Sequence, residues 1–376
     1  MNVVILVSLL LIGYTFVGYP LYLYAKNKRV KESRLNWKYP NREISVLLIV
    51  CNEANYIREK VKNILSLNYD QDRIRLIIVD DASEDSTVEI IESIGDPRIT
   101  LVKQKRRSGK AAGINLGMNY INSELVMLVD ARQSISANSM LNLASWFYPE
   151  SGVVAVSGEV RFRKEDGDES SGMDAYQRYE KFIRSTEAKI NGVPGVSGAL
   201  YMLKRDSFQS IPEDTILDDV LIPMVASQNG GWVGFDDRAV AWDIPSNDMD
   251  REKRRKTRTL NGNYQLLFRN LNWCIPSGHP LWFEFLSHKV SRLTAPFLAI
   301  IALIFSGILA IDGSKFHLIL TVLITATILT YPIVSFAPFL QKIKILKILS
   351  SFVALNWFNL LGFIDYVISG KKTSWK

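Results

Sequence analysis

Acidic residues stand directly after apolar runs in the first half of the sequence. Residues 76–79 are apolar and precede Asp80 and Asp81, and residues 125–129 are apolar and precede Asp130. Runs of this kind are typical of buried strands in a parallel sheet. Because ligands bind at the carboxyl ends of such strands, we expect these acids to face a ligand crevice.

The acids can accept hydrogen bonds from a ligand. A strand-end carboxylate accepts from any N–H or O–H donor, such as the N–H of a nucleotide base, and nearby backbone can serve carbonyl groups of the same ligand. Asn52 and Glu53, which follow the apolar run of residues 44–50, extend this group. The alternative is that these acids cap the next helix, as Ser83 and Asp85 can.

A basic turn introduces another helical pattern. Residues 105–110 read Lys-Arg-Arg-Ser-Gly-Lys, and small residues follow them. A helix start attracts anions through its free N–H groups and its dipole, so this turn with Lys110 is suited to a diphosphate. A solvated basic turn without a ligand is the alternative.

The elements that position these residues alternate between two patterns. Strands are expected at residues 44–50, 74–79, 99–102 and 125–129, and helices at 55–67, 88–94 and 109–120. This alternation predicts an α/β fold with a mostly parallel sheet, in one domain of residues 40–271. Beyond residue 153 the alternation weakens, with helices expected at 173–190 and 249–268 and strands at 199–203 and 232–235.

Strongly apolar segments flank this domain. Residues 1–25 are nearly long enough to cross a bilayer and lack the basic start and cleavage site of a signal peptide, which predicts an uncleaved transmembrane anchor. The basic residues that follow place the domain in the cytoplasm. Residues 275–292 suit an amphipathic helix at the membrane surface, and residues 293–369 suit two or three membrane helices before a tail of residues 370–376.

The last apolar segment, residues 345–369, fits two placements. It is long enough to span a membrane, but its polar breaks and the basic tail after it favour a surface-lying or re-entrant helix.

The charge distribution also indicates a membrane protein. The net charge is +7, and much of the basic excess lies beside the apolar ends. In that position it marks the cytoplasmic membrane face rather than a nucleic-acid site. The two cysteines lie far apart and the three histidines lack metal-ligand spacing, so neither set predicts a disulfide or a metal cluster.

Together, these motifs resemble those of the inverting glycosyltransferases of family 2, which use nucleotide-sugars and have the Rossmann-like GT-A fold. The likeness covers nearly the whole chain and is closer to the membrane-embedded branch that includes hyaluronan, chitin and cellulose synthases. It implies a nucleotide-sugar donor, with a UDP-sugar as the first choice. It also implies a polysaccharide or lipid-linked saccharide acceptor at the cell membrane. By this resemblance, the donor nucleotide binds to Asn52, Glu53, Asp80, Asp81, Lys110 and Asp130.

The metal motif of the family is altered in this chain. Family members usually have Asp-x-Asp, which holds a divalent cation, whereas this chain has Asp130-Ala131-Arg132. Asp130 remains a candidate ligand for the ribose or a metal, and Arg132 is a permanent cation suited to the diphosphate. The use of Mg²⁺ or Mn²⁺ is therefore left open.

The catalytic base is assigned by a fourth motif. Asp218 and Asp219 match the family's Thr-Glu-Asp sequence, whose last acid takes the proton from the acceptor hydroxyl, so the resemblance assigns Asp219 as the base. The small-residue turn around Ser197 and Gly198 resembles the acceptor-side loop, and Asp218 is placed on the same side. The alternative is a charge pair that only stabilises a helix start.

The basic helix expected at residues 249–268 supplies the last motif. Arg258 and Gly262 match the family's Gln-x-x-Arg-Trp-x-x-Gly, in which the arginine binds the leaving diphosphate. Arg255 replaces the glutamine and is a further candidate for the diphosphate. Thr259 replaces the tryptophan at the acceptor end, which leaves open whether a polymer is made. Trp375 resembles a tryptophan that closes over the nucleotide in some synthases.

Two rival functions follow from the same sequence. The altered metal motif and the lost tryptophan fit a catalytically impaired relative that binds a nucleotide or scaffolds a membrane complex. The apolar segments alone fit a transporter, but they are few for one and leave the charged domain without a role.

Overall fold

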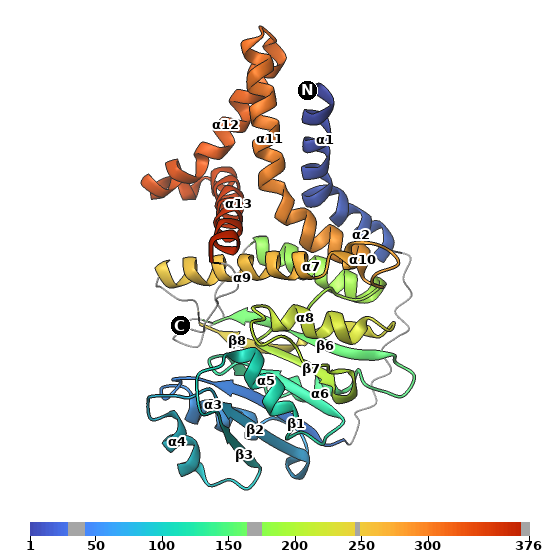
Figure 1. The fold of residues 1–376 in the computed structure, drawn as a ribbon, viewed down its shortest axis with the longest axis vertical. Coiled ribbons are helices and arrows are strands. Elements are labelled where there is room, and N and C mark those ends of the chain that lie inside the picture. The colour runs from blue at the N-terminus through green and yellow to red at the C-terminus, as the bar shows by residue number, and fades with distance from the viewer. Residues whose placement is uncertain (29–41, 164–174, 245–248, 370–376) are drawn as a thin grey trace. The chain divides into compact units, whose positions relative to one another are not determined.

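The computed structural model describes residues 1–28, 42–163, 175–244 and 249–369 (Figure 1). The chain separates into two compact units, each with its own interior. Among the described residues, one unit contains 1–22, 249–271 and 285–369, and the other contains 23–28, 42–163, 175–244 and 272–284. The predicted tail with Trp375 lies outside the described residues.

The second unit is built on an eight-stranded sheet in the order β3-β2-β1-β4-β7-β6-β8-β5. Its parallel half consists of β1 (Ile44–Val50), β2 (Ile74–Asp80), β3 (Ile99–Lys103) and β4 (Leu125–Val129). Its other half consists of β5 (Ser134–Ile135), β6 (Val153–Phe162), β7 (Leu200–Lys204) and β8 (Trp232–Asp243). There β7 runs antiparallel to β4 and β6, and β8 runs parallel to β6. The predicted α/β fold with a mostly parallel sheet is confirmed.

Helices cover this sheet, and their bounds are α3 (Ile57–Leu65), α4 (Thr87–Ile94), α5 (Lys110–Met118), α6 (Ser139–Ala144), α7 (Ala175–Ile190) and α8 (Asp218–Ser227). Helix α5 lies very close to the strands because it contains Gly113 and Gly117. A Cβ atom at Gly113 would lie 2.7 Å from Ile49 Cγ2, and one at Gly117 would lie 2.4 Å from Leu47 Cδ1. This close packing brings the helix start to the strand ends that the acids follow.

The first unit consists mainly of long helices: α1 (Asn2–Gly13), α9 (Met249–Arg269), α11 (Ser291–Ile311), α12 (Lys315–Phe336) and α13 (Lys344–Ser369). Helix α9 packs on α13, where Tyr264 Oη donates to Asn359 Oδ1 over 2.6 Å and the Asn261 amide donates to Asp365. The sequence prediction placed α9 at the end of the charged domain, whereas its packing partners are in the helical unit.

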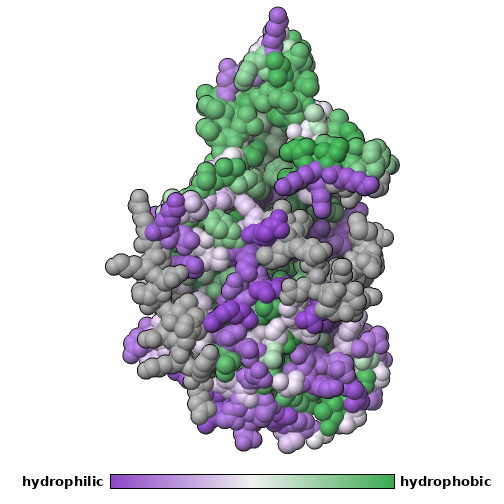
Figure 2. All heavy atoms as spheres, turned by 180° about the vertical axis from the view of Figure 1, so that it is seen from behind, coloured by the Kyte–Doolittle hydropathy of each residue, from purple (hydrophilic) through white to green (hydrophobic). Residues whose placement is uncertain are grey.

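Within the described residues, four helices are long and apolar enough to cross a membrane: residues 2–27, 282–311, 315–336 and 344–368. Apolar residues dominate the surface of these helices, whereas polar residues cover most of the sheet unit (Figure 2). Large side chains such as Leu6, Ile319 and Leu323 are about 60% exposed. Exposed apolar surface of this extent is costly in water and suits contact with lipid.

Two membrane predictions can be compared with the local structure. Helix begins at Trp282 rather than near residue 275, and it continues through α10 (Trp282–Glu284) and a π-helical turn (Phe285–Val290) into α11. The late start follows from Gly278 and Pro280, which favour turns before a helix. Residues 344–369 form one continuous helix, and its surface-lying placement stays a prediction.

Candidate active site

The strand ends of the parallel half meet at one edge of the sheet. In the register, Val50 pairs with Asp80 and Leu48 pairs with Val129, so the segments that follow β1, β2 and β4 leave the sheet side by side. The predicted donor residues of these three segments therefore come together, as expected for a strand-end crevice.

The first acid pair is held by backbone groups. Asp81 Oδ1 accepts from the N–H of Ser108 over 2.6 Å, and its Oδ2 accepts from the N–H of Gly109 over 2.9 Å. Asp80 accepts more weakly from the N–H of Ser83, over 3.2 Å. Both carboxylates are buried, and Asp81 ties the basic turn to the end of β2. These contacts hold the turn before α5 and the loop after β2 rather than cap α4, the next helix, so they differ from the capping alternative, and a nucleotide contact stays a prediction.

Asn52 joins the ends of β1 and β2. Its backbone is left-handed, with φ 55°, a conformation that asparagine tolerates. Its Oδ1 accepts from the N–H of Glu84 over 2.8 Å, and its own N–H donates to Ser83 Oγ over 2.9 Å. The Asn52 side chain is therefore engaged by the neighbouring loop.

Glu53 and Arg132 form an ion pair that the sequence did not indicate. Arg132 Nε donates to both carboxylate oxygens of Glu53, over 3.0 and 3.1 Å. The guanidinium also lies over the Tyr56 ring, 5.6 Å from its centroid. The Glu53 side chain is 9% exposed, so its negative charge is compensated mainly by Arg132.

Lys110 lies at the centre of the site. Its Nζ is 2.9 Å from Asp130 Oδ1 and 3.3 Å from Asp218 Oδ2. The lysine side chain is 17% exposed and that of Asp218 is 8% exposed. Burial alone would lower the pKa of Lys110, but Asp130, Asp218 and then Asp219 raise it above its ordinary value, so the ammonium stays charged.

Tyr201 on β7 lies beside this cluster. Its side chain is fully buried, and its hydroxyl has no hydrogen-bond partner among the described residues. Burial, followed by the charges of Asp218, Asp219 and Asp130, raises the pKa of Tyr201 well above its ordinary value. The hydroxyl is therefore a neutral, unpaired donor next to the carboxylates.

Asp219 is the second residue of α8 and packs against the turn of Ser197 and Gly198. Its backbone carbonyl accepts from the N–H of Val196 over 2.8 Å. A Cβ atom on Gly198 would lie 3.2 Å from Asp219 Oδ2, so the absence of a side chain there permits the close approach. The structure thus brings Asp219 next to this turn, and their roles as base and acceptor side stay a prediction.

Two residues that the sequence did not single out support this turn. Ser157 Oγ, at the middle of β6, accepts from Arg184 on α7 over 2.6 Å and from the N–H of Ser197 over 2.9 Å. Arg184 also lies over the Phe235 ring, 4.9 Å from its centroid. Neither residue belongs to a spaced motif, so only the folded chain reveals this arrangement.

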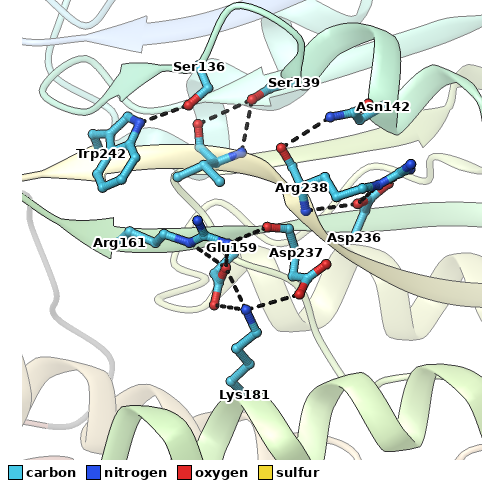
Figure 3. A network of polar contacts seen from close by, with 11 residues as sticks. Ser136, Ser139, Asn142, Glu159, Arg161, Lys181, Asp236, Asp237, Arg238 and Trp242 are labelled. Atoms are coloured by element: carbon cyan, nitrogen blue, oxygen red, sulfur yellow. Dashed lines mark hydrogen bonds and ion pairs between the residues drawn. The ribbon is translucent and has the colours of Figure 1, made fainter. Parts of the chain in front are cut away.

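An ion-pair network anchors the helix that carries Arg184. Lys181 Nζ lies 3.1 Å from Glu159 Oε1 and 3.0 Å from Asp237, and Arg161 also contacts Glu159 (Figure 3). Glu159 is buried on β6, and Asp237 lies on β8. Because Lys181 is one turn before Arg184, this network fixes the position of the arginine against the sheet.

Two predicted donor residues belong to the helical unit. Arg258 and Arg255 lie on α9, and Arg255 pairs with Glu252 over 3.0 Å. Their contact with a diphosphate stays a prediction.

The acids do not form a divalent-metal site. Among the described residues, no group of three or more histidine, cysteine, aspartate or glutamate side chains is placed to hold a metal. Asp130 is paired with Lys110, and the second motif position is an arginine that is itself paired. This donor set does not fit the oxygen-rich coordination that Mg²⁺ or Mn²⁺ prefers.

Known proteins resemble this chain in sequence and in fold. Residues 45–211, less than half of the chain, match the family model described as glycosyl transferase family 2. The chain therefore contains a region similar to this family.

Two curated relatives are named as polysaccharide synthases. Poly-beta-1,6-N-acetyl-D-glucosamine synthase of Staphylococcus aureus (strain MSSA476) is 23% identical over 236 residues, which cover 60% of this chain and 56% of the relative. The enzyme of Staphylococcus epidermidis is 24% identical over 268 residues, with coverage of 68% and 64%. The matched region thus spans less than two thirds of these relatives.

A solved structure shares the fold along nearly the whole chain. The mannosyltransferase PcManGT from Pyrobaculum calidifontis, in complex with GDP-Man and Mn²⁺, superposes with a TM-score of 0.74 and 19% identity. The match covers 98% of this chain and 99% of the mannosyltransferase. At this identity the likeness concerns the fold.

Proposed function

We propose that this chain is a membrane-anchored, inverting glycosyltransferase whose catalytic domain faces the cytoplasm. It transfers a sugar from a nucleotide-sugar to a polysaccharide or a lipid-linked saccharide. The observation that carries the proposal is the cluster in which Lys110 contacts both Asp130 and Asp218, because it joins the proposed donor end to the residue that precedes the proposed base, Asp219.

The donor is a nucleotide-sugar, with a UDP-sugar as the first choice. The staphylococcal relatives are named for an N-acetylglucosamine polymer, and the mannosyltransferase was solved with GDP-Man, so both nucleotides belong in a screen. The base and ribose lie near Asn52, Glu53, Asp80 and Asp81. The diphosphate lies at the start of α5, near Lys110, where a helix N-terminus favours an anion.

Asp219 acts as the general base. Its carboxylate takes the proton from the acceptor hydroxyl while the acceptor oxygen bonds to the anomeric carbon. The bond from that carbon to the diphosphate oxygen breaks, and its electron pair leaves with the nucleoside diphosphate. Attack from the opposite face inverts the anomeric centre. Gly198 leaves room for the acceptor beside Asp219, and Arg258 is proposed to bind the leaving diphosphate.

A divalent cation is the alternative source of positive charge at the diphosphate. The mannosyltransferase was solved with Mn²⁺, which supports a metal at this place in the fold. In this chain, Asp130 pairs with Lys110 and Arg132 pairs with Glu53. These ion pairs favour a positive charge supplied by the protein rather than by a metal.

The membrane helices fit either acceptor. A polysaccharide needs a route across the bilayer, whereas a lipid-linked saccharide reaches the site in the plane of the membrane. Four candidate spans beside a family 2 domain support both.

The test is release of the nucleoside diphosphate from a panel of UDP- and GDP-sugars by the purified full-length protein in lipid nanodiscs. We expect one donor to be turned over well above the others, with sugar recovered in a larger product. Nucleotide binding without release from any donor would instead support the impaired, scaffolding relative. Failure to bind any nucleotide would contradict both functions.

A further inference from the structure

The positive charge at the donor site has two candidate sources in the chain, Arg132 and Lys110. Arg132 stands where the family has its second metal-binding acid. However, its guanidinium is engaged by both oxygens of Glu53, and that carboxylate is nearly buried. Two of its three guanidinium nitrogens, Nε and Nη2, are therefore already engaged by Glu53 and are not free for an incoming diphosphate.

Lys110 is in a different situation. Its ammonium contacts carboxylates from two separate elements, Asp130 after β4 and Asp218 at the start of α8. Two carboxylates that share one compact cation are the arrangement in which a divalent metal is commonly held. Here the shared cation is the lysine, which the chain supplies itself at the start of α5.

The cluster also has a donor that the protein leaves unpaired. Buried hydroxyls normally have a hydrogen-bond partner, yet Tyr201 Oη has none among the described residues. Asp218 Oδ2 likewise accepts no hydrogen bond there, although it lies 3.3 Å from the lysine ammonium. Of these two atoms, only the Tyr201 hydroxyl can donate, and a phosphate oxygen is a suitable acceptor for both Tyr201 and Lys110.

We infer that Lys110 takes the place of the divalent cation, so that the nucleoside diphosphate binds to this glycosyltransferase without a metal. The inference rests on the proposed function, since it concerns the diphosphate of the same donor. Lys110 lies between Asp130 and the diphosphate, and Arg132 only holds Glu53 and the turn after β4 in place.

The test is calorimetric binding of UDP and GDP to the full-length protein in nanodiscs, in EDTA and then with Mn²⁺. We expect the Kd of the preferred nucleotide to change by less than about threefold between the two conditions. Replacing Lys110 with methionine removes a charge-assisted contact, so Lys110→Met weakens binding about tenfold or more in EDTA. The matched variant Arg132→Ala weakens binding less than Lys110→Met does, because it leaves Glu53 without its partner but removes no direct contact with the diphosphate.

Two further variants keep the test decisive if Lys110→Met unfolds. Lys110→Arg retains a cation and keeps measurable metal-free binding. The double variant Lys110→Met/Asp218→Asn removes one charge of each sign and binds as weakly as Lys110→Met alone.

The outcomes separate the two proposals. Binding that appears only with Mn²⁺ or Mg²⁺, or an Arg132→Ala loss equal to that of Lys110→Met, overturns the metal-free site and leaves the glycosyltransferase proposal standing. Absence of nucleotide binding in every condition overturns the proposed function itself.

Discussion

The two ends of the candidate site differ in how their polar groups are satisfied. At the ends of β1 and β2, Asp81 and Asn52 accept hydrogen bonds from backbone N–H groups of neighbouring loops. Around Lys110, side chains meet side chains, and the Tyr201 hydroxyl stays unpaired. The first region, at the ends of β1 and β2, is therefore a frame that holds loops in position. The second region, the cluster around Lys110, has a hydroxyl that can still bind a ligand.

This difference changes how acids at strand ends should be interpreted. Buried carboxylates with full sets of backbone donors are stabilised without a ligand. In a cluster where carboxylates share a buried cation beside an unpaired donor, a ligand can supply the missing hydrogen-bond partner. Substitutions in the frame should thus affect stability in addition to nucleotide binding, whereas substitutions in the cluster should affect binding or turnover.

The largest effect is expected at the proposed base. Asp219→Asn removes proton acceptance from the acceptor hydroxyl, which lowers transfer by about 10²–10⁴-fold. Nucleoside diphosphate affinity stays within about threefold, because the asparagine preserves the shape of the site. Transfer rates and calorimetric Kd values of the same preparation check both. Activity near that of the unaltered protein would remove Asp219 from the role.

In the frame, Asp81 is expected to matter for stability. Asp81→Ala leaves the N–H groups of Ser108 and Gly109 without their acceptor, which lowers the free energy of unfolding by about 2 kcal/mol. Asp81→Asn keeps one acceptor oxygen and loses less. Thermal unfolding in detergent compares the three proteins. Equal stability of all three would show that these contacts do not support the frame.

Lys60 makes the stability of the frame depend on pH. It is 3% exposed, and its Nζ donates to the carbonyl of Gln133 over 2.7 Å, in the turn after β4. Burial lowers the pKa of Lys60 from its ordinary 10.5 to about 7. The unfolded chain therefore binds more protons than the folded chain between these values.

As a result, the free energy of unfolding rises with pH in that window, by at most about 1.4 kcal/mol per pH unit from this residue. Lys60→Met is expected to lose this rise. Unfolding curves at pH 7 and at about pH 9 compare the variant with the unaltered protein. An unchanged slope in Lys60→Met would contradict the account.

The smallest effect is expected at the support of the acceptor-side turn. Ser157→Ala removes the acceptor shared by Arg184 and the N–H of Ser197, so kcat falls by less than about tenfold while the donor KM is unchanged. Ser139→Ala is a matched control, because this buried serine accepts from the N–H of Val240 in another part of the sheet. A parallel loss of kcat in both variants would show only general destabilisation.

Much of the frame could be predicted from sequence. The runs that form β1, β2 and β4 are apolar and almost fully buried, and burial on both faces leaves that unbroken pattern. Strand β6 was not predicted because its second half carries Glu159 and Arg161, which pair with each other, while Glu159 also pairs with Lys181 on α7.

The pairings within the site could not be predicted in the same way. Glu53 and Arg132 each matched a motif, but their ion pair joins positions 79 residues apart. Tyr201 and Arg184 belong to no spaced motif. Their importance is seen only in the folded chain, from the unpaired, buried hydroxyl of Tyr201 and the hydrogen bond from Arg184 to Ser157. Residue types thus indicated the chemistry, and only the fold showed which charges compensate each other.

The anomeric configuration of the product tests the central claim most directly. The purified protein in nanodiscs is supplied with the preferred α-linked sugar nucleotide, labelled with ¹³C at the anomeric carbon, and the product is analysed by NMR. The account predicts a β-linked sugar in an amount equal to the nucleoside diphosphate released. An α-linked product, or free sugar without a new linkage, would contradict it.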